Sequence, residues 1–229
     1  MKRKLAFSIL FVPFLVVSCG SNQSPANPTE QFEEYKIDFS SMELGSSNLI
    51  QSSDSTFKSK VLGFLSSNSN ERVTDISYSE NNYIRVKNDI YPGSYGSNQT
   101  LILASQNYDG YLSMSFSKEL RYIKIEAQQY YSITGGYDED PHFYPYYDCQ
   151  KYNEETSESE GDPDAYLDVS NHHMHIDCIS YQYDNDGYPI VNIPPMNEST
   201  IEINSNHVTL TALASYRIKV YSLTLLFKL

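Results

Sequence analysis

The segment LILASQNYDGYLSMSFSKELRYIKIEA, residues 101–127, decides the fold class. Apolar and polar residues alternate in Tyr111–Phe116 and Tyr122–Ala127, and Leu101–Ala104 is a short apolar run. A period of two is typical of strands with one buried face. We interpret the intervening sequences SQNYDG and SKEL as turns. The segment therefore predicts three consecutive strands of an antiparallel sheet.

Similar stretches recur along the chain. The further expected strands are Glu34–Ser40, Val73–Tyr78, Tyr83–Val86, Ala165–Val169, His172–Tyr183, Ile190–Ile193, Ser199–Ile203, His207–Leu213 and Arg217–Phe227. Only Ser55–Leu65 has helical spacing, with Ser55 or Asp54 as the expected N-cap. Short strands at regular spacing predict an all-β fold, a jelly-roll-like antiparallel β-sandwich with one short N-terminal helix.

The opening sequence MKRKLAFSILFVPFLVVSC, residues 1–19, has the pattern of an export signal. Three basic residues precede an apolar run over 5–17 that is too short for a comfortable membrane span. The ending VVSC resembles the bacterial lipobox, in which the cysteine is lipidated and becomes the new N-terminus after cleavage. The resemblance predicts a signal peptide that ends at a lipidated Cys19. The alternative is an ordinary secretory signal with a chance cysteine.

Residues 20–33 are polar and contain two prolines, which predicts a flexible tether. This tether would connect lipidated Cys19 to a single domain over 34–229. Two acyl chains anchor a protein stably in a bilayer. We therefore expect a protein anchored by lipid to the extracellular face of the cell membrane.

The charge of the chain limits its partners. Without residues 1–19, Lys and Arg together fall from 16 to 13 against 29 Asp and Glu, which leaves a net charge of −16. Such an acidic surface repels phosphates, so we expect no nucleic-acid partner. The sequence has no Gly-x-Ser-x-Gly, His-Glu-x-x-His or P-loop motif. We therefore expect no enzyme activity and no cofactor.

The order of segments over 70–229 resembles a β-sandwich module of lipoproteins from Gram-positive and wall-less bacteria, which also occurs beside secreted nuclease domains. The matching segments are Tyr91-Pro92-Gly93, Leu101–Ser105, Gly110–Phe116, Ile123–Ala127 and Arg217–Leu223. Ala104 stands where the pattern has glycine. The resemblance implies a jelly-roll-like sandwich at the cell surface, with no catalytic residues to carry over. No nuclease domain is present in this chain.

Residues 132–164 interrupt the strand pattern and predict a long acidic and aromatic loop. Its tyrosines Tyr137, Tyr144, Tyr146 and Tyr147 are candidates for a platform that stacks against sugar rings. Tyrosines at the ends of strands are the alternative, which is the commoner arrangement and the one we favour here.

The sequence NHHMHIDC, residues 171–178, is a candidate metal site. On a strand, His173, His175 and Asp177 would share one face, and a zinc ion would need a further ligand, for which His142 and His207 are available. The alternative is a strand with Met174, Ile176 and Cys178 inward and the imidazoles in solvent. We favour this alternative from the periodicity.

The sequence also contains a candidate calcium site and a candidate disulfide. Asp184 and Asp186 in YDNDGY could bind a structural calcium, but Pro195 stands where an EF-hand has its glutamate. We favour a hairpin turn as the explanation of this sequence. Cys149 and Cys178 could form a disulfide in an exported protein, or remain as two buried thiols.

These observations lead to one principal hypothesis, a surface lipoprotein with a non-catalytic β-sandwich that binds a glycan or a protein partner. A metal-dependent hydrolase built on the strand of His173 and His175 is the first alternative. A purely structural surface protein is the second.

Overall fold

The computed structural model describes residues 31–46, 48–89, 98–105, 107–130, 150–153, 158–161, 164–178, 180–183, 189–192, 195–214 and 216–229. The predicted signal, Cys19 and most of the tether lie outside these ranges. The first strand begins at Phe32, two residues before the expected start of the domain. Within the described ranges, no helix has the length and apolar character needed to cross a bilayer.

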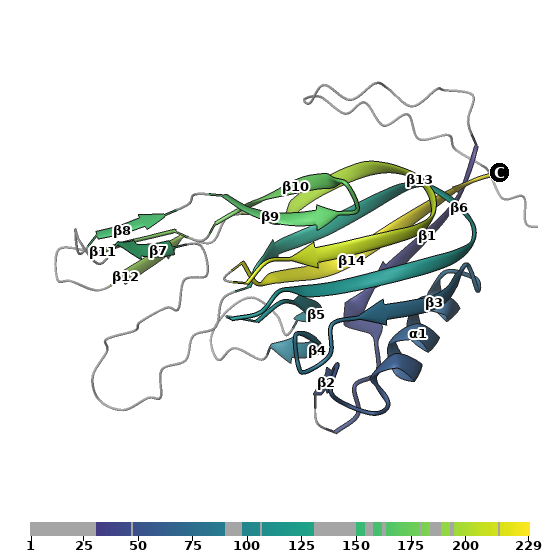
Figure 1. Cartoon of the computed structure of the whole chain (residues 1–229), viewed down its shortest axis with the longest axis horizontal. Helices are drawn as coiled ribbons and strands as arrows, with labels where there is room; N and C mark the ends of the chain where they lie inside the picture. The colour runs from purple at the N-terminus through teal and green to yellow at the C-terminus, as the bar shows by residue number, and fades with distance from the viewer. Residues whose placement is uncertain are drawn as a thin grey trace, which may run out of the picture. The chain divides into compact units, whose positions relative to one another are not determined.

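Ten strands of the described chain join in one sheet (Figure 1). They are β1 (Phe32–Asp38), β2 (Leu49–Gln51), β3 (Val73–Tyr78), β4 (Ile84–Asp89), β5 (Asn98–Leu103), β6 (Gly110–Gln129), β9 (Asp164–Val169), β10 (His172–Asp177), β13 (Asn197–Ala212) and β14 (Ile218–Lys228). The sheet order is β10-β9-β13-β6-β14-β5-β4-β2, with β1 on β14 and β3 on β6. Its strand pairs are antiparallel, and the predicted all-β class is confirmed.

Two smaller sheets were not expected in this form. The strands β7 (Gln150–Asn153) and β8 (Glu158–Gly161) pair with each other inside the segment predicted to be a loop, so that part of the prediction is wrong. The strands β11 (Ser180–Tyr183) and β12 (Pro189–Asn192) also pair with each other. The strand predicted over His172–Tyr183 is therefore two strands, β10 and β11.

Strand β6 continues through SKEL, so the predicted turn at 117–120 is wrong. The buried positions of β6 change from even-numbered residues, as at Leu112 and Met114, to odd-numbered residues after SKEL, as at Ile123 and Ile125. An irregular register lets a strand bend and still direct its apolar residues to one side. The interrupted period of two in the sequence therefore marks an irregularity in one long strand, and not a turn between two.

Strand β13 behaves in the same way, because the two strands expected over Ser199–Ile203 and His207–Leu213 are one. Its register against β6 shifts on both sides of Ser205. β6 pairs with β13 over both parts, and on its other edge with β3 first and β14 later. Long strands that bend and change partners are one way in which a sheet closes over its own core. The architecture is compatible with the expected sandwich, and the jelly-roll order stays a prediction.

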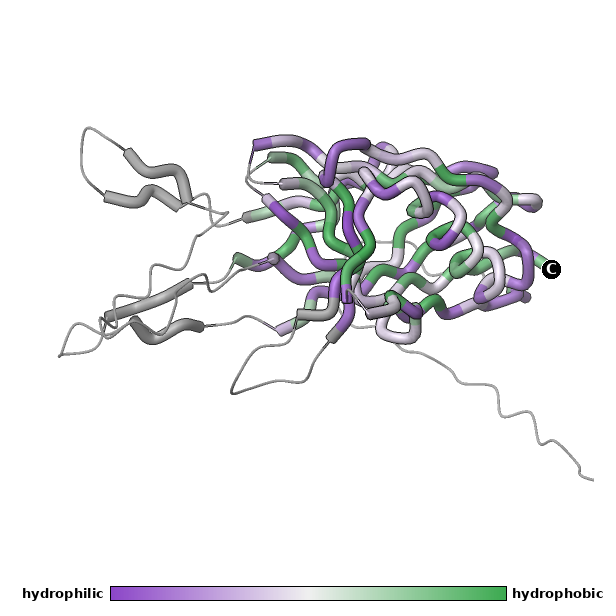
Figure 2. The backbone as a smooth tube through the Cα atoms, turned by 90° about the horizontal axis from the view of Figure 1, so that it is seen from below, coloured by the Kyte–Doolittle hydropathy of each residue, from purple (hydrophilic) through white to green (hydrophobic). Residues whose placement is uncertain are grey.

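The core lies on the inward side of the sheet, and the strands alternate between apolar and polar residues (Figure 2). Helix α1 (Phe57–Asn68) contributes Phe57, Val61 and Leu65, which are spaced by four and fully buried. The Phe57 ring meets the ring of Tyr78 on β3 at a centroid distance of 4.7 Å. The short 3-10 helix η1 (Phe39–Ser41) adds Phe39 to the same core.

The predicted helix exists, but its first residues differ from the expectation. The N-cap is Thr56, which makes no side-chain cap, and neither Ser55 nor Asp54 occupies that position. The Asp54 carboxylate instead accepts a hydrogen bond from the backbone N–H of Gln51 at 2.9 Å. Asp54 therefore closes the turn before the helix.

Candidate functional site

A pocket of about 610 Å³ opens between the β3–β4 turn and the β5–β6 loop. Four of its lining residues are tyrosines, and most of the others are acidic or amide residues. The lining residues are Tyr78, Ser79, Glu80, Asn81, Tyr83, Asn107, Tyr108, Asp109 and Tyr111. We call this feature the tyrosine pocket.

The β3–β4 turn has the sequence SENN, residues 79–82. Asn81 and Asn82 both have positive φ, 63° and 68°. Asparagine tolerates the left-handed region better than other residues with a side chain, so these two positions suit the sharp turn that connects β3 to β4. The local sequence therefore fixes this wall of the pocket.

The opposite wall depends on Gly110, the first residue of β6. A Cβ at Gly110 would lie 2.1 Å from the backbone N of Ala104 and 2.6 Å from the carbonyl O of Tyr83. Only glycine allows the chain to approach so closely. Ala104 itself has φ of 69°, in the left-handed region that favours glycine.

Hydrogen bonds hold the two walls together. Ser79 donates its N–H to the Tyr111 carbonyl at 3.1 Å, and the Tyr111 N–H donates to Ser79 Oγ at 3.0 Å. In the β5–β6 loop, Asp109 Oδ1 accepts from the Ala214 N–H at 2.7 Å. The pocket is therefore built from backbone that is already constrained before any ligand binds.

The aromatic rings of the pocket have different environments. The rings of Tyr83 and Tyr108 stack, with centroids 4.6 Å apart and an interplanar angle of 29°. The Tyr78 ring packs edge-on against the buried ring of Phe57. Tyr108 and Tyr111 are 54% and 39% exposed, so both present ring surface to solvent. Exposed rings on a fixed base, with carboxylates and amides at the rim, are suited to a ligand with flat apolar faces and many hydroxyls.

A second hollow of about 620 Å³ lies between η1 and α1. Its lining is mainly serine, asparagine and charged residues, with Phe64 as its one aromatic residue. Phe64 is partly buried and its ring packs against Phe39, which leaves less of it for a ligand. This hollow therefore has less binding chemistry than the tyrosine pocket.

Comparisons with known proteins do not identify the chain. No protein-family model matches it, and no curated protein does. The lipobox and the likeness to lipoprotein sandwich modules therefore stay expectations.

The histidine strand has the alternation expected of a half-buried strand. On β10, Met174 and Ile176 are buried, whereas His173 and His175 are exposed. His173 Nδ1 contacts the carboxylate of Asp168, which lies directly opposite on β9. The prediction that the imidazoles face solvent is confirmed.

The further ligands proposed for a zinc ion do not join these histidines within the described chain. His207 Nδ1 lies 3.4 Å from Ser115 Oγ, and its Nε2 lies 3.3 Å from Thr209 Oγ1. No group of three or more metal-ligating side chains occurs among the residues whose positions are described. His142, the other proposed ligand, lies outside those residues. The metal hypothesis receives no support from the geometry.

Other predicted sites fall outside the described residues. These are Cys19, Tyr137, Tyr144, Tyr146, Tyr147, Cys149, Asp184 and Asp186. Cys178, which directly follows β10, is disulfide-bonded. Its pairing with Cys149 stays a prediction, as do the tyrosine platform over 137–147 and the calcium site.

Sequence reasoning missed Tyr83, Tyr108 and Tyr111 as site residues. It interpreted SQNYDG as a plain turn and Tyr83 and Tyr111 as strand ends. Tyr108 could have been found, because it lies within the predicted turn SQNYDG. A tyrosine ring in a surface turn is far from the core and is therefore available to a ligand. The pairing of the two loops, however, depends on the fold and is not visible in the sequence.

Proposed function

We propose that the chain is a surface lipoprotein whose β domain binds a glycan in the tyrosine pocket without catalysis. The observation that carries this proposal is the stacked pair of Tyr83 and Tyr108, of which Tyr108 is 54% exposed. A ring fixed by a second ring loses little conformational entropy when a ligand packs on it. A pyranose has an apolar face of similar size, and burial of such surface favours binding.

The polar rim supports a sugar over other flat ligands. Glu80, Asn81 and Asn107 are exposed at the rim and can accept or donate hydrogen bonds to hydroxyl groups. Nucleobases also stack on tyrosine, but a binding site for single strands combines rings with cations along the backbone. Carboxylates at this rim would repel phosphates. The rim therefore favours hydroxyl-rich ligands.

Catalysis by the rim carboxylates has no support in the geometry. General acid–base work needs a carboxyl in a site that excludes water. Glu80 is exposed, and Asp109 is also exposed while it holds the Ala214 N–H. Both groups therefore act as solvated acceptors or as parts of the loop.

The experiment that tests this proposal is a glycan-array screen of the full chain held in mild detergent, followed by calorimetry on each positive oligosaccharide. We expect saturable binding to at least one glycan class, with weaker binding by Tyr108→Ala. A chain that binds no glycan while its urea-unfolding transition is intact would contradict the proposal. That result would favour the purely structural surface protein.

A further inference from the structure

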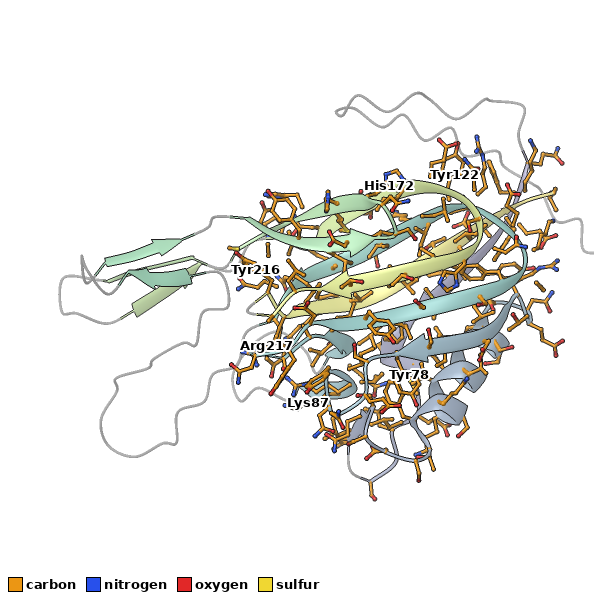
Figure 3. All side chains as sticks on the ribbon, in the orientation of Figure 1. Tyr78, Lys87, Tyr122, His172, Tyr216 and Arg217 are labelled. Atoms are coloured by element: carbon orange, nitrogen blue, oxygen red, sulfur yellow. The ribbon has the colours of Figure 1, made fainter. Side chains whose placement is uncertain are left out.

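The charge in the tyrosine pocket has one sign. Its lining contains two carboxylates, Glu80 and Asp109, and no basic side chain lines it among the described residues. Glu80 belongs to the β3–β4 turn and Asp109 to the β5–β6 loop, so opposite walls of the pocket each supply one acidic group. Figure 3 labels Tyr78, the pocket residue at the end of β3. The tyrosine rings therefore lie in a region of negative potential.

No neighbouring cation neutralises either carboxylate within the described ranges. Glu80 is exposed, and its carboxylate makes no hydrogen bond or ion pair with the residues that the structure describes. Asp109 Oδ1 accepts a hydrogen bond from the neutral N–H of Ala214 at 2.7 Å. A carboxylate has several acceptor sites, and it forms its strongest hydrogen bonds with charged donors. Both groups can therefore accept from a positively charged group on a ligand.

The basic side chain nearest to the pocket in sequence packs on a different ring. Arg85 follows Tyr83 by two residues, and its Cζ lies 5.3 Å from the ring centroid of Tyr130. Arg217 Cζ lies 4.6 Å from the same centroid. Tyr130 is only 3% exposed, and a cation close to a buried ring is attracted to it. The guanidinium of Arg85 is therefore engaged outside the lining of the tyrosine pocket.

The exposed rings add to the attraction for a cation. Tyr108 is 54% exposed and Tyr111 is 39% exposed. The face of an aromatic ring is negative and attracts an ammonium group within about 6 Å of its centroid. The Ser105 N–H donates to the Tyr108 carbonyl at 2.9 Å, which closes the loop that carries Tyr108 and Asp109. One short loop therefore supplies a ring for the face of a sugar and a carboxylate for a cation.

We infer that the glycan of the tyrosine pocket is an oligomer of amino sugars with free, protonated amino groups. The inference rests on the proposed glycan binding and adds the charge of the ligand. The face of the sugar would pack on Tyr108, and its ammonium group would pair with Asp109 or Glu80. N-acetylation keeps the sugar ring and removes its charge, so charge complementarity would distinguish the free sugar from the acetylated one.

The test compares two oligomers of equal length by calorimetry on the full chain in mild detergent. One is an oligomer of glucosamine, in a buffer that protonates its amino groups, and the other is an oligomer of N-acetylglucosamine. The chain has a net charge of −13, so a polycation is also attracted to acidic surfaces outside the pocket. An oligolysine with the charge of the glucosamine oligomer therefore tests whether positive charge alone is sufficient.

The variants remove one charge each and keep the shape of the side chain. They are Glu80→Gln and Asp109→Asn, and the amide oxygen at position 109 can still accept the Ala214 N–H. Glu34→Gln is the matched control, because Glu34 is an exposed glutamate on β1 that does not line the pocket. Glu80→Gln carries the test alone if Asp109→Asn fails to fold.

We expect the glucosamine oligomer to bind about tenfold more tightly than the acetylated oligomer. Glu80→Gln and Asp109→Asn should each reduce that preference by about threefold, and Glu34→Gln should retain it. Tyr108→Ala should weaken the binding of both oligomers. Added salt should reduce the preference, because it screens exposed charges.

Two results would leave the proposed function in place and remove the amino sugar. One is binding of the acetylated oligomer that is as tight as that of the glucosamine oligomer and is weakened by Tyr108→Ala. The other is binding of array glycans without binding of either oligomer.

Two further results would assign the positive charge to another cause. Equal loss of preference in Glu34→Gln and Glu80→Gln would show a general attraction to the acidic surface. Oligolysine binding as tight as that of the glucosamine oligomer, with the same dependence on Glu80, would assign the pocket to a basic peptide. Binding to neither oligomer and to no array glycan would contradict the proposed function itself.

Discussion

Gly110 and Ala104 are in backbone contact so close that a Cβ on Gly110 would lie 2.1 Å from the Ala104 nitrogen. This contact joins the start of β6 to the end of β5 and shapes one wall of the tyrosine pocket. The packing of β5 against β6 and the shape of the pocket wall therefore both depend on Gly110. A change at Gly110 should affect both stability and binding.

Gly110→Ala should lower the free energy of unfolding by about 2 kcal/mol or more, because the new methyl group meets backbone that has no free space. Gly63→Ala is the matched control. Gly63 is exposed in α1 with no atom within 4 Å of its Cβ position, so alanine there should stabilise by about 0.5–1 kcal/mol. Urea unfolding measures both. Equal effects of the two substitutions would contradict the contact.

Ile176→Ala should cost about 2–5 kcal/mol of stability, because Ile176 is fully buried on β10. His175→Ala, one position earlier on the exposed face, should change stability by less than about 0.5 kcal/mol. Thermal unfolding with and without added zinc separates the packing role from a metal role. A large zinc-dependent stabilisation that His175→Ala abolishes would restore the metal hypothesis.

Glu33 should make the stability depend on acidity. Hydrogen bonds from Arg72 hold the pKa of Glu33 below its usual 4.5 against the opposing effect of burial, and Lys118 lowers this pKa further. A lowered pKa stabilises the fold above the unfolded value and loses that stabilisation as the pH falls through the folded value. Glu33→Gln should therefore destabilise at neutral pH, and its difference from the wild type should shrink below pH 4.5.

Urea midpoints measured across this pH range check the prediction for Glu33. Glu34→Gln is the control, since Glu34 is the exposed neighbour on β1. A difference between wild type and Glu33→Gln that stays constant into strong acid would contradict the role assigned to Arg72 and Lys118.

Cys149→Ser should lower the free energy of unfolding by about 2–4 kcal/mol, the usual contribution of a disulfide that closes a loop of moderate length. Cys178→Ser should have the same effect, and the double variant should cost no more than either single one. Mass spectrometry of unreduced peptides tests the pairing directly. Labelling of Cys149 by a thiol reagent in the native protein would exclude the pair.

The strand pattern predicted the all-β class because one buried face imposes a period of two on most strands. It failed at 117–120, where β6 continues through an irregular register that sequence alone presents as a turn. It also missed the short strand β2, whose three residues are too few to show a period. Local patterns therefore gave the class, while the bends and partners of the long strands depend on tertiary packing.

The candidate site was less predictable than the fold. Its wall at Asn81 and Asn82 follows from turn chemistry. The meeting of Tyr83 with Tyr108, however, depends on two loops separated in the sequence. The grouping of Arg85 with Arg217 and Tyr130 likewise depends on the register of three strands.

The most direct measurement is the affinity of the first array-positive oligosaccharide for Tyr111→Ala and Tyr166→Ala. Both tyrosines are 39% exposed, but only Tyr111 lines the tyrosine pocket. Loss of a stacked ring should weaken binding by about tenfold, so we expect that loss for Tyr111→Ala and wild-type affinity for Tyr166→Ala. Wild-type affinity in Tyr111→Ala, or equal loss in both variants, would contradict glycan binding in the tyrosine pocket.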